Sequence, residues 1–118
     1  MLNKFMKDLR ALKSATVYSM RGLAALIKER AFYQELLVGV LVLVIELLRD
    51  APDCDRIRVF SAYFLILMAE CANTAIETVI DRIGPEKHDL SRRAKDLGSA
   101  LVFLAIIHFG VIWICLFI

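Results

Sequence analysis

The chain has few of the residues on which many soluble enzymes rely. Its three cysteines, Cys54, Cys71 and Cys115, form no CxxC pair and no Cys/His spacing suited to a metal, so we interpret them as packing residues. Its five glycines form no Walker A or other glycine-rich phosphate loop, so any nucleotide site would be of an unrelated kind. No short apolar core followed by a small-residue cleavage site begins the chain, and we expect no cleaved signal peptide.

Apolar residues are abundant, by contrast. They make up 59% of the 118 residues and the mean hydropathy is +0.64, although 24% of the residues are charged. These values are compatible if the charges lie in blocks between apolar runs, and they do. The composition therefore predicts a small integral membrane protein with a single domain, 1–118, and no nucleic-acid partner.

Three apolar runs are long enough to cross a bilayer, at 31–48, 57–80 and 97–118. A polar loop with Pro52 separates the first two runs, and Gly84-Pro85 ends the second. The charged connection that follows is expected to be partly helical. The predicted fold is all-α, with three transmembrane helices.

The first 28 residues predict a further helix, which lies on the membrane surface. Apolar side chains recur at helical spacing, and basic side chains occupy the opposite side. The apolar set is Leu2, Phe5, Met6, Leu9 and Leu12, and the basic set is Lys4, Lys7, Arg10 and Lys13. An amphipathic basic helix of this kind binds an anionic membrane surface.

The distribution of lysine and arginine predicts the orientation. Seven lie in residues 1–30, three between the first and second runs, five between the second and third, and none after the third. The positive-inside rule therefore places the N-terminus and the 82–96 loop in the cytoplasm.

One helical face of the second run carries an unusual set of polar residues. Glu70, Asn73, Thr74, Glu77 and Asp81 all share it. Carboxylates at membrane depth are costly unless they face a cavity, a cation or a partner, so this face is the expected functional site. The alternative is a seam of hydrogen bonds between helices.

The same residues suggest a chemistry. Glu29 and Glu77 suit a divalent cation that carries phosphate, and Glu70, deeper in the helix, could take a proton from a lipid hydroxyl. The loop contributes groups that could hold phosphates: Lys87, His88, Arg92, Arg93 and Lys95. That loop could equally be a solvated charge cluster that sets topology. Residue spacing alone predicts a site at the cytoplasmic interface that could bind a cation. It does not predict that the protein is a kinase.

The stretch 69–100 resembles the bacterial diacylglycerol kinase family. It contains the pattern E-x-x-N-[ST]-A-I-E, then D, then E-x-H, then A-K-D-x-G-S, and the similarity extends over essentially the whole chain. The resemblance implies a homotrimer of the inner membrane, with three transmembrane helices and a surface helix per chain. It also implies transfer of phosphate from magnesium-ATP to diacylglycerol, with phosphatidic acid as product.

By motif position, the resemblance implies that Glu70 is the general base and that Glu29 and Glu77 are ligands of Mg²⁺. It implies that the nucleotide-contacting residues are Arg10, Tyr18, Glu29, Glu77, Glu86, Lys87, His88, Lys95 and Asp96. The substrate-side or supporting residues are Arg10, Glu35, Glu70, Asn73 and Ser99. Two residues depart from the family pattern, since Arg92 stands where a glycine is expected and Lys87 where an aromatic is common.

Three other functions remain open at this point. An undecaprenol kinase has the same architecture with a polyprenol acceptor, although the stretches around Asp81 and Lys95 resemble the diacylglycerol branch more closely. A small cation-coupled transporter would use an intramembrane glutamate but would need no charged 82–96 loop. A structural membrane subunit would leave the paired carboxylates without a task. We also expect the active sites to lie between chains, because three thin helices cannot enclose both a polar face and a nucleotide.

Overall fold

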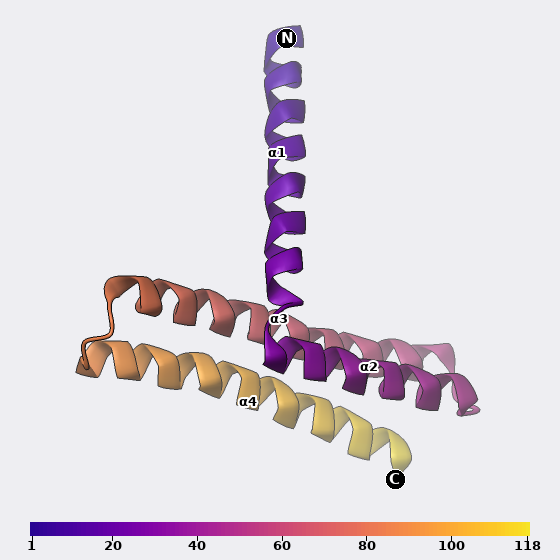
Figure 1. Cartoon of the computed structure of the whole chain (residues 1–118). Helices are drawn as coiled ribbons and strands as arrows, with labels where there is room; N and C mark the ends of the chain where they lie inside the picture. The colour runs from indigo at the N-terminus through magenta and orange to yellow at the C-terminus, as the bar shows by residue number, and fades with distance from the viewer.

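The computed structural model describes residues 1–118 and consists of four helices without a strand (Figure 1). In chain order these are α1 (Leu2–Leu26), α2 (Arg30–Leu48), α3 (Asp53–Ile83) and α4 (Asp89–Phe117). The prediction of an all-α fold is confirmed. By length and composition, α2, α3 and α4 can each cross a membrane, so the chain is a multi-pass membrane protein.

Helix α1 runs crosswise to the other three helices and stands clear of them (Figure 1). Leu26, its last residue, is its only buried side chain, and apolar residues such as Phe5 and Leu9 are exposed. A helix that lies across a set of membrane-spanning helices is parallel to the bilayer plane. The geometry therefore suits the predicted surface helix, whose apolar stripe no other part of the chain covers.

Helices α3 and α4 form a long antiparallel pair joined by a short turn (Figure 1). They contain 31 and 29 residues, whereas α2 contains 19. At a rise of about 1.5 Å per residue, each of the long helices exceeds the roughly 30 Å of a hydrocarbon core by about three turns. Helix α2 begins near the middle of α3 and lies beside only the N-terminal half of α3, which follows the α2–α3 loop (Figure 1). The other half, with the α3–α4 turn, extends beyond α2.

The helix ends follow from local sequence. Helix α3 begins at Asp53, four residues before the predicted apolar run, because Pro52 stands at its N-cap and two aspartates in the first turn favour a helix N-terminus. It ends at Ile83, where Gly84 adopts a φ of 143° that side chains rarely allow. Helix α4 begins at Asp89, because the Nδ1 atom of His88 accepts a hydrogen bond from the Leu90 N–H at 3.1 Å. Much of the predicted 82–96 connection is therefore helical.

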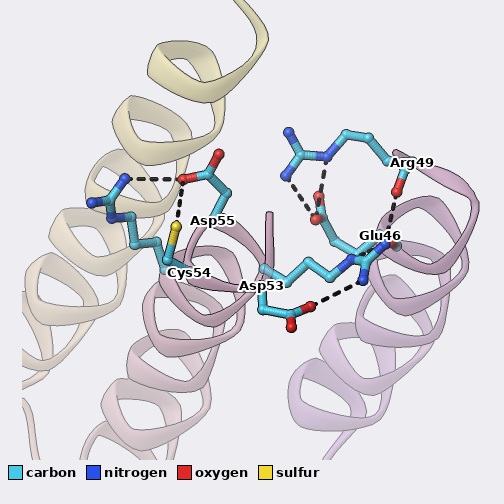
Figure 2. Close-up of polar contacts among 7 residues, drawn as sticks. Glu46, Arg49, Asp53, Cys54 and Asp55 are labelled. Atoms are coloured by element: carbon cyan, nitrogen blue, oxygen red, sulfur yellow. Dashed lines mark hydrogen bonds and ion pairs between the residues drawn. The ribbon is translucent and has the colours of Figure 1, made fainter. Parts of the chain in front are cut away.

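A polar cluster joins α2 to α3 at the end of the bundle farthest from the α3–α4 turn (Figure 2). Glu46 is fully buried and pairs with Arg49 at 2.8 Å. The Arg56 guanidinium donates to the backbone oxygens of Glu46 and Arg49, at 3.1 and 2.9 Å. Because these are carbonyls at the C-terminal end of α2, Arg56 caps that helix from α3. The Glu46 carboxylate thus forms an ion pair within the end of α2, and the contact between the two helices is made by Arg56.

The C-terminal half of α4 carries a ladder of aromatic rings. Phe109, Trp113 and Phe117 contact one another in sequence, with centroid separations of 5.0 and 5.5 Å. The Arg49 guanidinium lies 4.8 Å from the Phe117 ring centroid, so a cation–π contact links this end of α4 to the polar cluster.

The three cysteines do not pack within the chain. All are free and exposed, so the interpretation of these residues as packing residues is wrong for a single chain. Cysteine is usually buried, but here all three side chains lie on the exposed faces of their helices.

Candidate active site on the polar face of α3

The polar face of α3 becomes more exposed toward the α3–α4 turn. Glu70 and Asn73 are 6% and 8% exposed, whereas Glu77 and Asp81 are exposed. The prediction that Glu70 is the deeper carboxylate and Glu77 the one nearer water is consistent with this gradient. A helix of this length can hold both environments because it begins in the bundle and ends beyond it.

Carboxylates from α2 and α3 gather around Glu70. Glu70 lies within range of the charges of Glu77 and Glu29, and Glu35 lies within range of Glu70. Glu29 is the N-cap residue of α2, which places it where the chain leaves the surface helix and meets α3. Glu70 thus interacts electrostatically with each of the three other glutamates that were predicted as metal ligands and support.

None of these four glutamates forms an ion pair with a lysine or arginine of the chain. The salt bridges involve other acidic residues: Glu46, Asp53, Asp55, Asp81 and Asp89. Like charges left together without a basic partner are unfavourable, especially near apolar surroundings. Uptake of a proton or a bound cation would relieve the repulsion.

The donor set fits magnesium better than a fully enclosed metal. No group of three or more His, Cys, Asp or Glu side chains in the chain could hold a metal ion by itself. Mg²⁺ commonly takes one or two protein carboxylates and completes its shell with water and substrate phosphates. Glu29 and Glu77 could supply such carboxylates, and both residues are exposed.

Two contacts organise the neighbourhood of Glu70. The Nδ2 atom of Asn73 donates a hydrogen bond to Glu77 Oε1 at 3.4 Å. The Tyr63 hydroxyl donates to the Glu35 carbonyl at 2.6 Å and so fixes α2 against α3. Asn73 and Glu35 each retain one buried oxygen atom, Oδ1 and Oε2, that accepts no hydrogen bond.

A polar pocket of about 690 Å³ lies at the α3–α4 turn, beside the exposed end of the polar face. Five of the predicted nucleotide-contacting residues line it: Glu86, Lys87, His88, Lys95 and Asp96. Lys95 reaches across from α4 to Asp81 on α3, with 2.8 Å between Nζ and Oδ1. Arg92, one of the departures from the family pattern, also lines the pocket and pairs with Asp89 at 3.5 Å.

Three predicted residues do not join these groups within one chain. Arg10 and Tyr18 lie on α1, which stands clear of the other helices (Figure 1), and both are exposed. Ser99 is exposed on α4, and no hydrogen bond of its side chain is present. The chain alone therefore assembles the carboxylates and the pocket, but not the whole predicted site.

Two residues near the site, Tyr63 and Gly98, were not predicted to take part in it, and Asp81 was predicted only as a member of the polar face. Tyr63 positions α2, Asp81 holds Lys95, and Gly98 of α4 packs directly against Asn73. Asp81 was placed on the polar face, and a lysine fourteen residues further along gave no signal of pairing. Gly98 was only part of a motif, because the sequence does not show which α3 residue it faces.

These features define a class: a small multi-pass α-helical membrane protein with a carboxylate-rich site beside a polar pocket lined by both acidic and basic side chains. The family model of prokaryotic diacylglycerol kinase matches residues 17–117. The chain is 46% identical over 105 residues to the diacylglycerol kinase of Escherichia coli strain K12, covering 88% of this chain and 85% of that protein. It is 39% identical over 101 residues to the diacylglycerol kinase of Haemophilus influenzae, covering 85% and 86%. It is also 39% identical over 106 residues to that of Pseudomonas aeruginosa, covering 89% and 86%.

The chain belongs to the prokaryotic diacylglycerol kinase family and is an enzyme of the kinase class. This confirms the family that the motifs indicated. The undecaprenol kinase and the cation-coupled transporter are not favoured, because the matched relatives carry the name diacylglycerol kinase.

Proposed function

We propose that this chain transfers the γ-phosphate of magnesium-ATP to the free hydroxyl of diacylglycerol, giving phosphatidic acid. The observation that carries the proposal is the group of four glutamates without basic partners, next to a polar pocket at the end of the α3–α4 pair. The names of the matched relatives supply the acceptor.

In this mechanism Glu70 is the general base. Glu70 is 6% exposed and lies farther from the α3–α4 turn than Glu77, so it is the carboxylate that a hydroxyl from the membrane would meet. Removal of the hydroxyl proton by Glu70 would accompany attack of the oxygen on the γ-phosphorus and departure of ADP. The phosphoryl group passes between the two oxygens with little other covalent chemistry, so positioning and charge stabilisation account for most of the catalysis.

Glu29 and Glu77 would bind magnesium-ATP through the cation, which neutralises charge on the phosphates. The pocket at the α3–α4 turn would receive the nucleotide, with Lys87, His88 and Lys95 as donors to it. Lys95 would then exchange its present partner, Asp81, for a phosphate oxygen. Asn73 would support Glu77 through the hydrogen bond between them.

We further propose that the active enzyme is a homotrimer with sites between chains. Arg10 and Tyr18 are exposed on a helix that stands clear of the bundle, and the half of the α3–α4 pair that bears the pocket has no α2 beside it. A neighbouring chain can supply both the missing residues and the missing cover. The family resemblance gives the number three.

The distribution of lysine and arginine supports an inner-membrane location with the N-terminus and the α3–α4 turn in the cytoplasm. This orientation would place the polar pocket in the compartment that contains ATP.

The reaction can be tested with purified protein in mixed micelles containing labelled ATP, Mg²⁺ and either diacylglycerol or undecaprenol. The expected product is labelled phosphatidic acid, formed only when Mg²⁺ is present. Faster labelling of undecaprenol, or labelling of neither alcohol, would overturn the proposed acceptor.

Site sharing can be tested by mixing two impaired variants, Glu70→Gln and Arg10→Ala, under conditions in which subunit exchange is verified. If the carboxylates of one chain and Arg10 of a neighbouring chain form one site, mixed oligomers contain some intact sites and activity returns in part. No recovery at any mixing ratio would contradict the sharing of a site between chains.

A further inference from the structure

Gly98 lies at a very close contact between α3 and α4. It is the only buried residue of α4. A β-carbon built on Gly98 would overlap the Asn73 Oδ1 atom, and would lie 3.4 Å from Asn73 Cγ and 3.5 Å from Ile76 Cδ1. The Asn73 amide therefore occupies the space that any side chain at position 98 would need.

This space determines how the Asn73 amide is oriented. Its Oδ1 atom faces Gly98, is buried and accepts no hydrogen bond. Its Nδ2 atom faces Glu77 and donates to Oε1 at 3.4 Å. The reverse orientation would place the amide oxygen against a carboxylate, which is repulsive.

We propose that Gly98 is a positioning residue for the magnesium-nucleotide site. Its missing side chain allows Asn73 to lie against α4, and from there the Asn73 amide holds the Glu77 carboxylate. The chain of contact runs from Gly98 to Asn73 to Glu77, and Gly98 itself touches neither metal nor nucleotide. The inference rests on the proposed role of Glu77 as a ligand for magnesium-ATP.

A purely structural role for Gly98 makes a different prediction. Small residues are common where membrane helices pack closely, and a larger residue there would simply separate α3 from α4. Such a change would lower stability and the amount of active enzyme, without selectively changing the concentration of magnesium-ATP needed for half-maximal rate. A positioning role therefore predicts a higher KM for magnesium-ATP, whereas a purely structural role predicts less active enzyme with an unchanged KM.

The test compares Gly98→Ala with Gly110→Ala, which changes another glycine of α4. A β-carbon at Gly110 meets nothing within 4 Å, so Gly110→Ala serves as the matched control. Alanine is the better helix former in both cases, so lost backbone propensity cannot explain a defect. For Gly98→Ala we expect the KM for magnesium-ATP to rise about threefold to tenfold, the factor that corresponds to one modest hydrogen bond. The KM for diacylglycerol should change little, and Gly110→Ala should match wild type in both constants.

A double-mutant cycle then tests the route through Asn73. Asn73→Ala leaves room for a β-carbon at position 98 and should itself raise the KM for magnesium-ATP. In the Asn73→Ala background, Gly98→Ala should raise the KM for magnesium-ATP by less than about twofold, because the amide that it displaces is already absent. Asn73→Ala also serves if Gly98→Ala alone fails to fold, since an unchanged KM in that variant would overturn the proposal.

Two other results would overturn the inference: a wild-type KM for magnesium-ATP in Gly98→Ala, or an equal rise with and without Asn73. Glu77→Gln is measured alongside to separate this inference from the proposed function. If Glu77→Gln raises the KM and Gly98→Ala does not, only the positioning role is refuted. If Glu77→Gln leaves the KM unchanged, the proposed role of Glu77 fails, and the positioning role fails with it.

Discussion

Arg56 should contribute far more to stability than its neighbour on the same helix, Arg58. Arg56 donates to two backbone carbonyls at the end of α2, at 3.1 and 2.9 Å, and its side chain is 33% exposed. Arg58 is 61% exposed, and its only partner is Asp55, at 3.0 Å. The pair therefore offers a comparison between a capping arginine and a surface arginine.

The expected magnitudes follow from these contacts. Hydrogen bonds to a charged group contribute about 1.5 to 3 kcal/mol each, and water can partly replace them at a half-exposed site, so we expect Arg56→Ala to cost about 3 kcal/mol. Arg58→Ala should cost no more than about 1 kcal/mol, as for other exposed ion pairs. The measurement is the free energy of unfolding of both variants in the same detergent.

Activity provides a second readout for the same variants. Arg56 is fourteen residues from Glu70 along α3, or about 21 Å. Well below the unfolding midpoint, both variants should therefore retain the wild-type rate per folded enzyme. Equal, small losses of stability in Arg56→Ala and Arg58→Ala would refute the capping role of Arg56.

Three further variants test contacts nearer the site. Tyr63→Phe removes the hydroxyl that donates to the Glu35 carbonyl, and should lower the free energy of unfolding by about 1 kcal/mol in a denaturation experiment. Lys95→Ala should raise the KM for ATP without a change in unfolding midpoint, because its ion pair with Asp81 is exposed and adds little stability; an unchanged KM would remove Lys95 from the nucleotide site. Arg92→Gly should raise the KM for ATP and make it less sensitive to salt, since one positive charge leaves the pocket; an unchanged salt dependence would show that Arg92 does not face the phosphates.

The sequence predicted the helices well because their determinants are local. Three apolar runs gave the three long helices, and Gly84-Pro85 correctly marked the end of α3. The predicted starts of α3 and α4 were less accurate, because an apolar run marks only the part of a helix that lies in the hydrocarbon core. Both helices begin several residues before their apolar runs. Asp53 and Asp89 start helices through capping and first-turn charge instead.

The site was predictable as a face but not as a set of contacts. Helical spacing placed Glu70 and Glu77 on one side of α3, and the burial gradient between them agrees with that pattern. Spacing gave no information on which α4 residue meets Asn73, because that depends on the rotation of α4 about its own axis. The close approach of Gly98 therefore needed the structure.

The residues of α1 illustrate a limit of another kind. Arg10 and Tyr18 entered the predicted site by resemblance to a family, which transfers positions without saying which chain uses them. In the structure they stand apart from the carboxylates. Arg10 and Tyr18 can therefore join a site only if chains associate. The sequence of one chain determines that association only through the residues on its surface.

The central claim is the division of labour between Glu70 and Glu77, and a paired measurement tests it most directly. Turnover and magnesium-ATP affinity are measured for Glu70→Gln and Glu77→Gln in the same detergent. Glu70→Gln should reduce turnover about 100- to 10,000-fold while magnesium-ATP still binds, because the variant lacks only the base. Glu77→Gln should weaken magnesium-ATP binding, with partial recovery at high Mg²⁺. Loss of nucleotide binding in Glu70→Gln together with normal binding in Glu77→Gln would contradict the account, and unchanged turnover in both would reduce the polar face of α3 to a packing seam.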